Sequence, residues 1–189
     1  MSTSQQSLCG LVFLGLSVDG RIARPDGDLD WLTSRGAAAG DAGFTPFMES
    51  VDAVVMGRKT YEAIAPEEHW PYLDRPIHVI STTLAADVDP RITVHRSPEA
   101  ATGAMQRDGH RRVYVDGGET IRWFLAAKLV EELTLSHVPV LIGEGPSLFG
   151  PLGGDISLEH VRTAVLGGGM VQTTYRVVDG PTPRGDHVG

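Results

Sequence analysis

Apolar residues gather in short runs along the first two thirds of the chain, and residues that favour turns bound each run. Residues 8–18 are almost continuously apolar and end at Asp19-Gly20, a pattern typical of a strand buried on both faces. Shorter runs predict strands at 53–56, 77–80, 91–95 and 112–115. Helical spacing and capping signals predict helices at 44–50, 60–65, 98–107 and 119–128. Strands therefore alternate with helices in this part of the chain.

The C-terminal third has a period of two. Residues 132–140 alternate between polar and apolar, and the runs 157–166 and 170–178 flank three glycines, as in a β-hairpin. Alternating strands and helices imply right-handed crossovers and parallel pairing, to which the hairpin adds an antiparallel edge. The sequence predicts a three-layer α/β/α fold with a mostly parallel central sheet. We expect a single domain over 8–179, with disordered ends at 1–7 and 180–189.

The composition and charge of the chain argue against several classes of function. The 189 residues carry a net charge of −8, which argues against nucleic acid as a partner because a binding surface for phosphates is basic. Cys9 is the one cysteine, and the seven histidines show no metal-ligand spacing, so we expect neither disulfide nor metal. No apolar run is long enough to span a membrane, and the first seven residues do not resemble a signal peptide. We expect a soluble, cytoplasmic protein.

Three junctions after predicted strands could bind phosphate. Residues 56–61 (MGRKTY) and 115–120 (VDGGET) are glycine turns that lead into helices, and 81–83 is a run of hydroxyl side chains. Glycine lets a ligand approach the backbone, and helix amides with nearby cations favour an anion. The alternative is that the glycines only form turns and the hydroxyls only cap them. Neither the G-x-G-x-x-G fingerprint nor the phosphate-binding loop of NTPases is present.

These segments resemble the dihydrofolate reductase superfamily. Residues 55–60 (VMGRKT), 79–82 (VIST) and 115–118 (VDGG) are similar to its two glycine turns and its strand that ends in hydroxyls. Residues 16–23 (LSVDGRIA) and 138–145 (VPVLIGEG) are more similar to the C-terminal reductase domain of the bifunctional riboflavin deaminase-reductase. The resemblance extends from about residue 8 to residue 178. The chain lacks that enzyme's deaminase half, which implies a stand-alone reductase.

The resemblance implies NADPH as cofactor and hydride transfer to a small heterocyclic or ribose-linked substrate. The function that the resemblance favours is that of 5-amino-6-(5-phosphoribosylamino)uracil reductase. The alternatives are a true dihydrofolate reductase and a non-catalytic NADPH-binding sensor. By this resemblance Arg58, Ser81 and Thr82 hold the 2′-phosphate, and the nicotinamide lies near 16–22. The implied cofactor site comprises Gly57, Arg58, Lys59, Thr60, Ser81, Thr82, Gly117, Gly118, Glu119 and Thr120.

Three carboxylates are candidates for catalysis, and each has a structural alternative. Asp19 either adjoins the nicotinamide pocket or closes a turn with Gly20. Asp41 matches the pterin-binding carboxylate by position but lies among glycine and alanine, where a solvated loop is the alternative. Glu144 lies between two glycines. A further departure is Asp116, which replaces the first glycine of the dihydrofolate reductase turn and brings a carboxylate close to bound phosphates.

We also expect a homodimer. The riboflavin-type reductases that the chain resembles are dimers, and the strands predicted at 133–140 and 170–178 would offer exposed edges for pairing.

Overall fold

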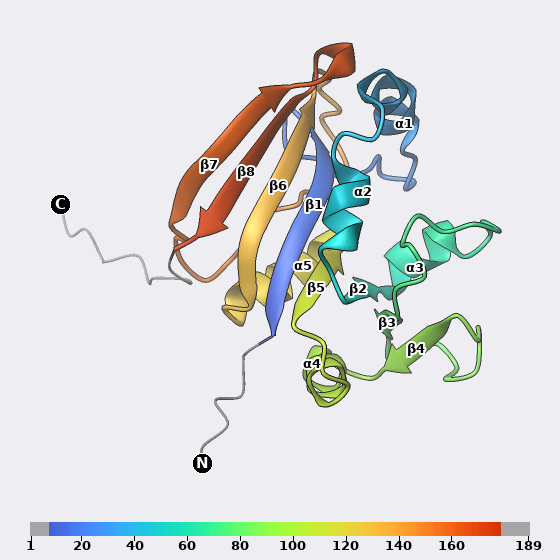
Figure 1. Ribbon diagram of the computed structural model, residues 1–189. Helices are drawn as coiled ribbons and strands as arrows, with labels where there is room; N and C mark the ends of the chain where they lie inside the picture. Colours follow the sequence, from blue (N-terminus) through green and yellow to red (C-terminus); the bar gives the residue numbers. More distant parts are fainter. Residues whose placement is uncertain (1–7, 179–189) are drawn as a thin grey trace.

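The computed structural model describes residues 8–178, which form one eight-stranded sheet with helices on both faces (Figure 1). The strands are β1 (Cys9–Ser17), β2 (Ala53–Gly57), β3 (Ile77–Ile80), β4 (Ile92–His95), β5 (Arg112–Asp116), β6 (Val130–Val138), β7 (Leu158–Val165) and β8 (Val171–Val177). The α-helices are α1 (Asp30–Gly36), α2 (Phe44–Glu49), α3 (Arg58–Ile64), α4 (Pro98–Arg107) and α5 (Gly118–Ala126). Short 3-10 turns, η1 (Ala37–Ala39) and η2 (Gly167–Gly169), complete the set.

The strand order is β4-β3-β2-β5-β1-β6-β8-β7. The first six strands in this order are parallel to one another, and β8 and β7 pair antiparallel at one end. This arrangement confirms the predicted fold class. The segment between β1 and β2 is more regular than expected, because α1 and η1 form there despite its many small residues. The predicted ends, and Asp179 of the predicted domain, lie outside the described residues.

Two cores lie on opposite faces of the sheet. Met105 of α4 and Phe124 of α5 are fully buried in one core, and Met48 of α2 and Tyr61 of α3 are buried in the other. Figure 1 shows α2 in front of β1 and β5, with α5 behind them. The residues of β2 from 53 to 56 are fully buried whichever way they point, since both faces are covered. Each large apolar side chain so buried contributes about 1.5–3 kcal/mol.

The two edges of the sheet differ from the prediction. β6 lies between β1 and β8, and β8 lies between β6 and β7, so neither has a free edge. The expectation that residues 133–140 and 170–178 would offer pairing edges is therefore wrong. The sequence pattern could not reveal this order, because alternation shows which face of a strand is buried and not which neighbour it has. Within residues 8–178 the edge strands are β4 and β7, and every residue of β7 is exposed.

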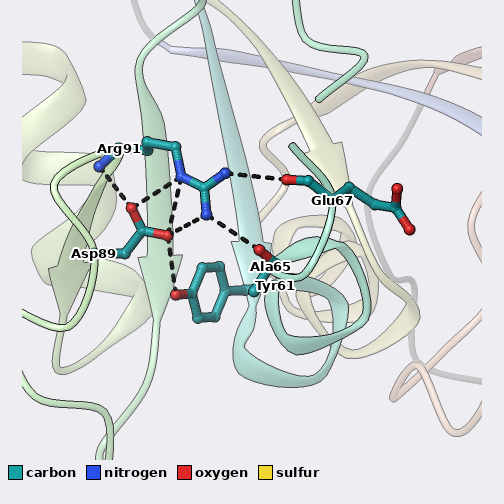
Figure 2. Close-up of polar contacts among 5 residues, drawn as sticks. All are labelled: Tyr61, Ala65, Glu67, Asp89 and Arg91. Atoms are coloured by element: carbon teal, nitrogen blue, oxygen red, sulfur yellow. Dashed lines mark hydrogen bonds and ion pairs between the residues drawn. The ribbon is translucent and has the colours of Figure 1, made fainter. Parts of the chain in front are cut away.

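A partly buried ion pair attaches the end of α3 to the turn before β4 (Figure 2). Arg91 holds the Asp89 carboxylate by three side-chain hydrogen bonds of 2.7–3.1 Å, and the Tyr61 hydroxyl donates to the same carboxylate at 3.3 Å. The guanidinium also donates to the carbonyl oxygens of Ala65 and Glu67, which follow α3. Carbonyls at a helix end lack intrahelical donors, so Arg91 satisfies groups that would otherwise face water. The contacts fix how α3, and the glycine turn before it, lie on the sheet.

Three histidines meet at the β3–β4 side of the sheet. His78 is 4% exposed, and its Nδ1 lies 2.9 Å from Nε2 of His95, with the His110 ring packed against its edge. The His78 Nε2 is buried and has no hydrogen-bond partner. Burial, together with His95 and His110, lowers the pKa of His78 to about 4, while Asp108 opposes this shift. No three His, Cys, Asp or Glu side chains within 8–178 have the arrangement of a metal site.

His78 should make the fold acid-sensitive. Because its pKa is lower in the folded protein than in the unfolded chain, the unfolded chain binds the proton first as the pH falls. The free energy of unfolding should therefore decrease between about pH 6.5 and pH 4, with His78 responsible for on the order of 3 kcal/mol. Urea titrations across this range should show a smaller decrease for His78→Gln. The control His160→Gln, on exposed β7, should keep the wild-type slope; an equal slope for His78→Gln would contradict the assignment.

One further finding concerns membranes. Along the described part of the chain, residues 8–178, the helices are too short and too polar to cross a bilayer.

Candidate functional site

The carboxyl ends of the parallel strands lie along one edge of the sheet. In spatial order, the residues that follow β3, β2, β5 and β1 begin at Ser81, Arg58, Gly117 and Val18. Chain segments far apart in sequence therefore become neighbours at this edge. In open α/β sheets this is the edge where ligands bind.

The two predicted glycine turns pack directly against each other. Gly117 has φ +86°, and the Thr60 hydroxyl lies so close to it that a side chain at this position would collide with it. Conversely, the Thr120 hydroxyl lies 3.3 Å from the point that a Cβ on Gly57 would occupy. Gly117 thus requires glycine, whereas a side chain at Gly57 would crowd Thr120. The pairing of Met56 with Asp116 sets this register.

The second turn carries backbone donors that have no acceptor within the helix that follows. In α5 the first intrahelical bond runs from the amide of Ile121 to the carbonyl of Gly117. The amides of Gly118, Glu119 and Thr120 precede it, so they have no acceptor within the helix. Three adjacent N–H groups at a helix start favour an anionic ligand. The side chains of Lys59 and Glu119 are exposed at this edge, and Thr120 is buried.

Two of the groups expected to bind phosphate, Arg58 and Ser81, already have partners. Arg58 donates to both carboxylate oxygens of Glu62, at 2.7 and 2.9 Å, one helical turn further along α3. The buried Ser81 hydroxyl accepts from the amides of Thr83 and Leu84, so it shapes its own turn, while Thr82 is exposed. These contacts hold the groups in place at the edge, and the Arg58 contact is an exposed ion pair of small energy.

Sequence reasoning missed a second guanidinium at this turn. Arg96 Nη1 donates to the carbonyl oxygens of Ser81 and Leu84, at 3.0 and 2.6 Å. It follows β4 directly, and the parallel pairing of β4 with β3 brings it to the same edge. The sequence signal that could have identified Arg96 is its position directly after the predicted strand 91–95.

Asp19 joins two loops at the end of β1. Its carboxylate accepts from the backbone amides of Ile142 and Gly143, at 3.1 and 2.7 Å. These bonds and one from the Ser17 hydroxyl lower the pKa of Asp19 to about 2. The left-handed Gly20 (φ +76°) closes the turn. Asp19 therefore does close a turn, as in the structural alternative, and it also fixes the position of the loop after β6.

The other two predicted carboxylates are exposed. Asp41 accepts from the amide and the hydroxyl of Thr45, at 2.7–3.1 Å, which is the geometry of a helix-capping carboxylate at the start of α2. These bonds lower the pKa of Asp41. Glu144 is exposed in the loop after β6, next to Gly145, whose carbonyl accepts from Arg21 at 3.0 Å.

A buried carboxyl lies immediately beside the second glycine turn. Asp116, the last residue of β5, is 8% exposed, and the Tyr72 hydroxyl donates to its Oδ2 at 3.1 Å. Burial raises the pKa of Asp116, while hydrogen bonds from Tyr72, the Gly117 amide and Tyr114 oppose the shift. Asp116 was noticed in the sequence as a departure from a motif. The sequence alone could not show that Asp116 is buried, and burial is what raises the pKa of its carboxyl.

A polar cavity of about 570 Å³ adjoins the β1 and β6 end of this edge. Its lining includes Arg24, Asp30, Trp31 and Arg35 from the segment after β1, and Val140 from the segment after β6. The Trp31 indole Nε1 is buried there without a hydrogen-bond partner. Charged and aromatic groups around a cavity beside a strand end suit a small polar substrate.

The sequence from residue 10 to residue 172 matches the model of the RibD C-terminal domain family. This chain belongs to that family. It is 28% identical over 160 residues to the protein YwjB of Bacillus subtilis (strain 168), covering 83% of this chain and 91% of that protein. A crystal structure of a putative riboflavin biosynthesis protein from Shewanella sp. PV-4 superposes with a TM-score of 0.81, at 32% identity, over 90% of this chain and 99% of that one.

The fold is shared with more distant reductases. The Thermotoga maritima diaminohydroxyphosphoribosylaminopyrimidine deaminase/5-amino-6-(5-phosphoribosylamino)uracil reductase has a TM-score of 0.69 at 14% identity, over 93% of this chain and 58% of that protein. At this identity the similarity concerns the fold alone. Family membership is carried by the family model and is consistent with the 32% identical Shewanella structure.

Proposed function

We propose that the protein is an NADPH-dependent reductase that transfers a hydride to a small heterocyclic or ribose-linked substrate. The observation that carries the proposal is the pair of interlocked glycine turns on the carboxyl edge of the sheet, in a chain of the RibD C-terminal domain family. A reduced nicotinamide, when bound, supplies the hydride. The remaining chemistry belongs to residues of this chain.

The described residues fit an extended dinucleotide. The amides of Gly118, Glu119 and Thr120, with the hydroxyl of Thr60 beside Gly117, would hold the pyrophosphate. Arg58 and Lys59 add positive charge on the neighbouring turn. The turn that begins at Ser81 and Thr82, flanked by Arg96, would hold the adenosine end, so the nicotinamide would extend toward Asp19.

Reduction of a carbon–nitrogen double bond also requires a proton at nitrogen. Asp19 is a poor donor, because a carboxyl with a pKa of about 2 is ionised at neutral pH. Asp41 and Glu144 are exposed, and the Asp41 carboxylate is bonded to Thr45. Asp116 is the buried carboxyl beside the second turn, and burial favours its protonated form. Asp116 is level with Phe13 of β1 and is bonded to Tyr72, so it is not placed to reach a substrate beyond the end of β1, and Asp19 holds the loop after β6.

The substrate is proposed to lie in the cavity of Arg24, Asp30, Trp31 and Arg35. Two guanidinium groups suit a phosphate or another polar substituent of a ribose-linked heterocycle. The alternative of a true dihydrofolate reductase needs a carboxylate for the pterin, and Asp41 instead caps α2. The Thermotoga neighbour is named for a phosphoribosylamino-uracil reductase, which makes that compound the first substrate to test.

The decisive experiment follows NADPH oxidation by its absorbance, with 5-amino-6-(5-phosphoribosylamino)uracil and with dihydrofolate. We expect turnover with the former and none with the latter, because Asp41, which matches the pterin-binding carboxylate by position, is bonded to Thr45 instead. Turnover with dihydrofolate alone would identify a folate reductase. NADPH binding without turnover would favour the non-catalytic sensor, and absence of binding would refute the cofactor site.

Arg58 and Glu62 provide a test of cofactor preference. Arg58→Ala should weaken NADPH binding about tenfold to a hundredfold, the loss expected for one charge-assisted hydrogen bond, with little effect on NADH. Glu62→Gln should tighten NADPH binding, because the carboxylate no longer competes with the phosphate for Arg58. Calorimetric titration of both cofactors measures this. Equal affinity of the wild type for the two cofactors would contradict the assignment of the 2′-phosphate.

We propose a homodimer that pairs through β7, in place of the buried strands predicted from the sequence. β7 is an unpaired edge, and its Val161 and Val165 are 43% and 79% exposed. Long, exposed, apolar edge strands are ready to pair with another chain.

Light scattering should give a mass of about 40 kDa, twice that of the 20.2 kDa chain. The double variant Val161→Lys/Val165→Lys should give the monomer mass, because paired charges at the edge oppose association. A matched change on the other edge strand, Thr93→Lys in β4, should leave the mass unchanged. A wild-type mass near 20 kDa at micromolar concentration would refute the dimer.

A further inference from the structure

We propose that Arg35 binds an anionic group of the substrate and is the residue by which the substrate cavity selects a phosphorylated compound over an unphosphorylated one. The inference rests on the proposed function, because it takes the cavity beside the ends of β1 and β6 as the substrate site. It names the group that is recognised and the side chain that recognises it.

Most polar side chains of the cavity are already bonded within the protein. Arg24 forms an ion pair with Asp28, and its backbone amide donates to the Asp28 carbonyl at 3.1 Å. The hydroxyls of Thr33 and Ser34 donate to backbone carbonyls one helical turn earlier. These bonds shape the loop of residues 24–28 and the helix α1. Each of these donors therefore has its acceptor in the protein.

Arg35 differs from the other polar groups of the cavity. Of the two guanidinium groups in the lining, that of Arg35 has no hydrogen-bond, ion-pair or ring partner among residues 8–178. The residue is exposed and faces the cavity. A guanidinium carries five N–H donors in a planar fork, which can pair with two oxygens of one phosphate or carboxylate. Arg35 is therefore the cation that a ligand in the cavity can engage.

The turn between β7 and β8 fixes the backbone that carries Arg35. A Cβ on Gly168 (φ +70°) would lie 2.9 Å from the Arg35 carbonyl oxygen, and one on Gly167 would collide with the carbonyl of Ala38. The turn can approach the end of α1 this closely because glycine has no side chain. The glycines of η2 thus do more than reverse the chain, since they also hold the helix end from which the Arg35 side chain projects.

The position of α1 places Arg35 at one end of the cavity. Near the start of the helix, Leu32 packs against β1 so closely that a side chain at Gly15 would collide with it. The end of the helix contacts Gly168, in the turn that joins β8 to β7 at the edge of the sheet. Arg35 therefore lies on the side of the cavity that is farther from β1, β5 and the proposed position of the nicotinamide.

The charges along α1 give the cavity a direction. Asp30 lines the cavity in the first turn of the helix and Arg35 in the last, and no ion pair joins the two side chains. Five residues of α-helix correspond to about 7.5 Å along the axis. An anionic group is attracted at the Arg35 end and repelled at the Asp30 end. A ribose-linked heterocycle would consequently lie with its phosphate toward the hairpin turn and its ring toward the end of β1.

The same two charges would also stabilise α1 without any ligand, because an acid at the start and a base at the end of a helix complement its dipole. The helix α4 has this arrangement too, with Glu99 in its first turn and Arg107 in its last. Arg107 is exposed and lies outside the lining of the cavity. It therefore provides a matched control for Arg35.

The test compares 5-amino-6-(5-phosphoribosylamino)uracil with its unphosphorylated ribosylamino counterpart. In the wild type the KM of the unphosphorylated compound should be about tenfold to a hundredfold higher, the loss expected for one charge-assisted contact. Arg35→Gln should abolish this preference by raising the KM of the phosphorylated compound alone, with kcat little changed, and Arg35→Lys should restore part of it. Arg107→Gln should keep the wild-type ratio. A wild type without the preference, or a preference that Arg35→Gln retains, overturns the proposal.

A second measurement needs no turnover. In the ¹⁵N-labelled, cofactor-free protein, the indole N–H resonance of Trp31 reports ligands in the cavity that this residue lines, and its loss in Trp31→Phe identifies it. Ribose 5-phosphate should shift this resonance in the wild type and in Arg107→Gln but not in Arg35→Gln, and ribose should shift it in none of them.

The outcomes of this titration separate the two proposals. No shift in the wild type, or a shift that Arg35→Gln retains, overturns the assignment of Arg35. A shift that only Arg35→Gln abolishes, in a protein that turns over no substrate, upholds the anion site and refutes the proposed function alone.

Discussion

The site depends on the close approach of two glycine turns. β2 and β5 are adjacent and parallel, so the turn after each strand begins at the same height, and the threonine of one fills the space over the glycine of the other. A side chain at Gly117 would collide with Thr60. The packing of the two turns therefore shapes the anion site that we propose at the start of α5.

The rest of the edge is held by hydrogen bonds that keep its loops in place. Asp19 ties the loop after β6 to the turn after β1, Arg96 ties the turn after β3 to β4, and Arg91 ties the end of α3 to the sheet (Figure 2). Each uses a side chain to satisfy backbone groups that strands and helices leave unpaired at their ends. A ligand that lies along the edge consequently meets a prearranged surface, and less ordering accompanies its binding.

The sequence was sufficient for most of the fold because its signals are local. Ser97 before Pro98 fixes the start of α4, where the Ser97 hydroxyl accepts from the Ala100 amide as a helix cap should. The order of β6, β8 and β7 depends on contacts between segments that are distant in sequence. The edges of the sheet were predicted wrongly for that reason. The candidate site divides in the same way. Glycine turns carry their own signal, whereas the partner of Arg58, the reach of Arg96 and the meeting of Tyr72 with Asp116 depend on tertiary contacts.

Asp19 and Asp116, which follow or end neighbouring strands, show how the surroundings of an aspartate shift its pKa in opposite directions. Asp19 accepts backbone amides at a partly open turn, which stabilises its charge and fits it to hold a loop. Asp116 is enclosed by two tyrosines, and burial disfavours the same charge. Surroundings that shift the pKa values of two carboxyls in opposite directions therefore give the same side chain a different charge preference at each strand end. In the sequence, Asp-Gly occurs at both positions, and only the packing around each distinguishes them.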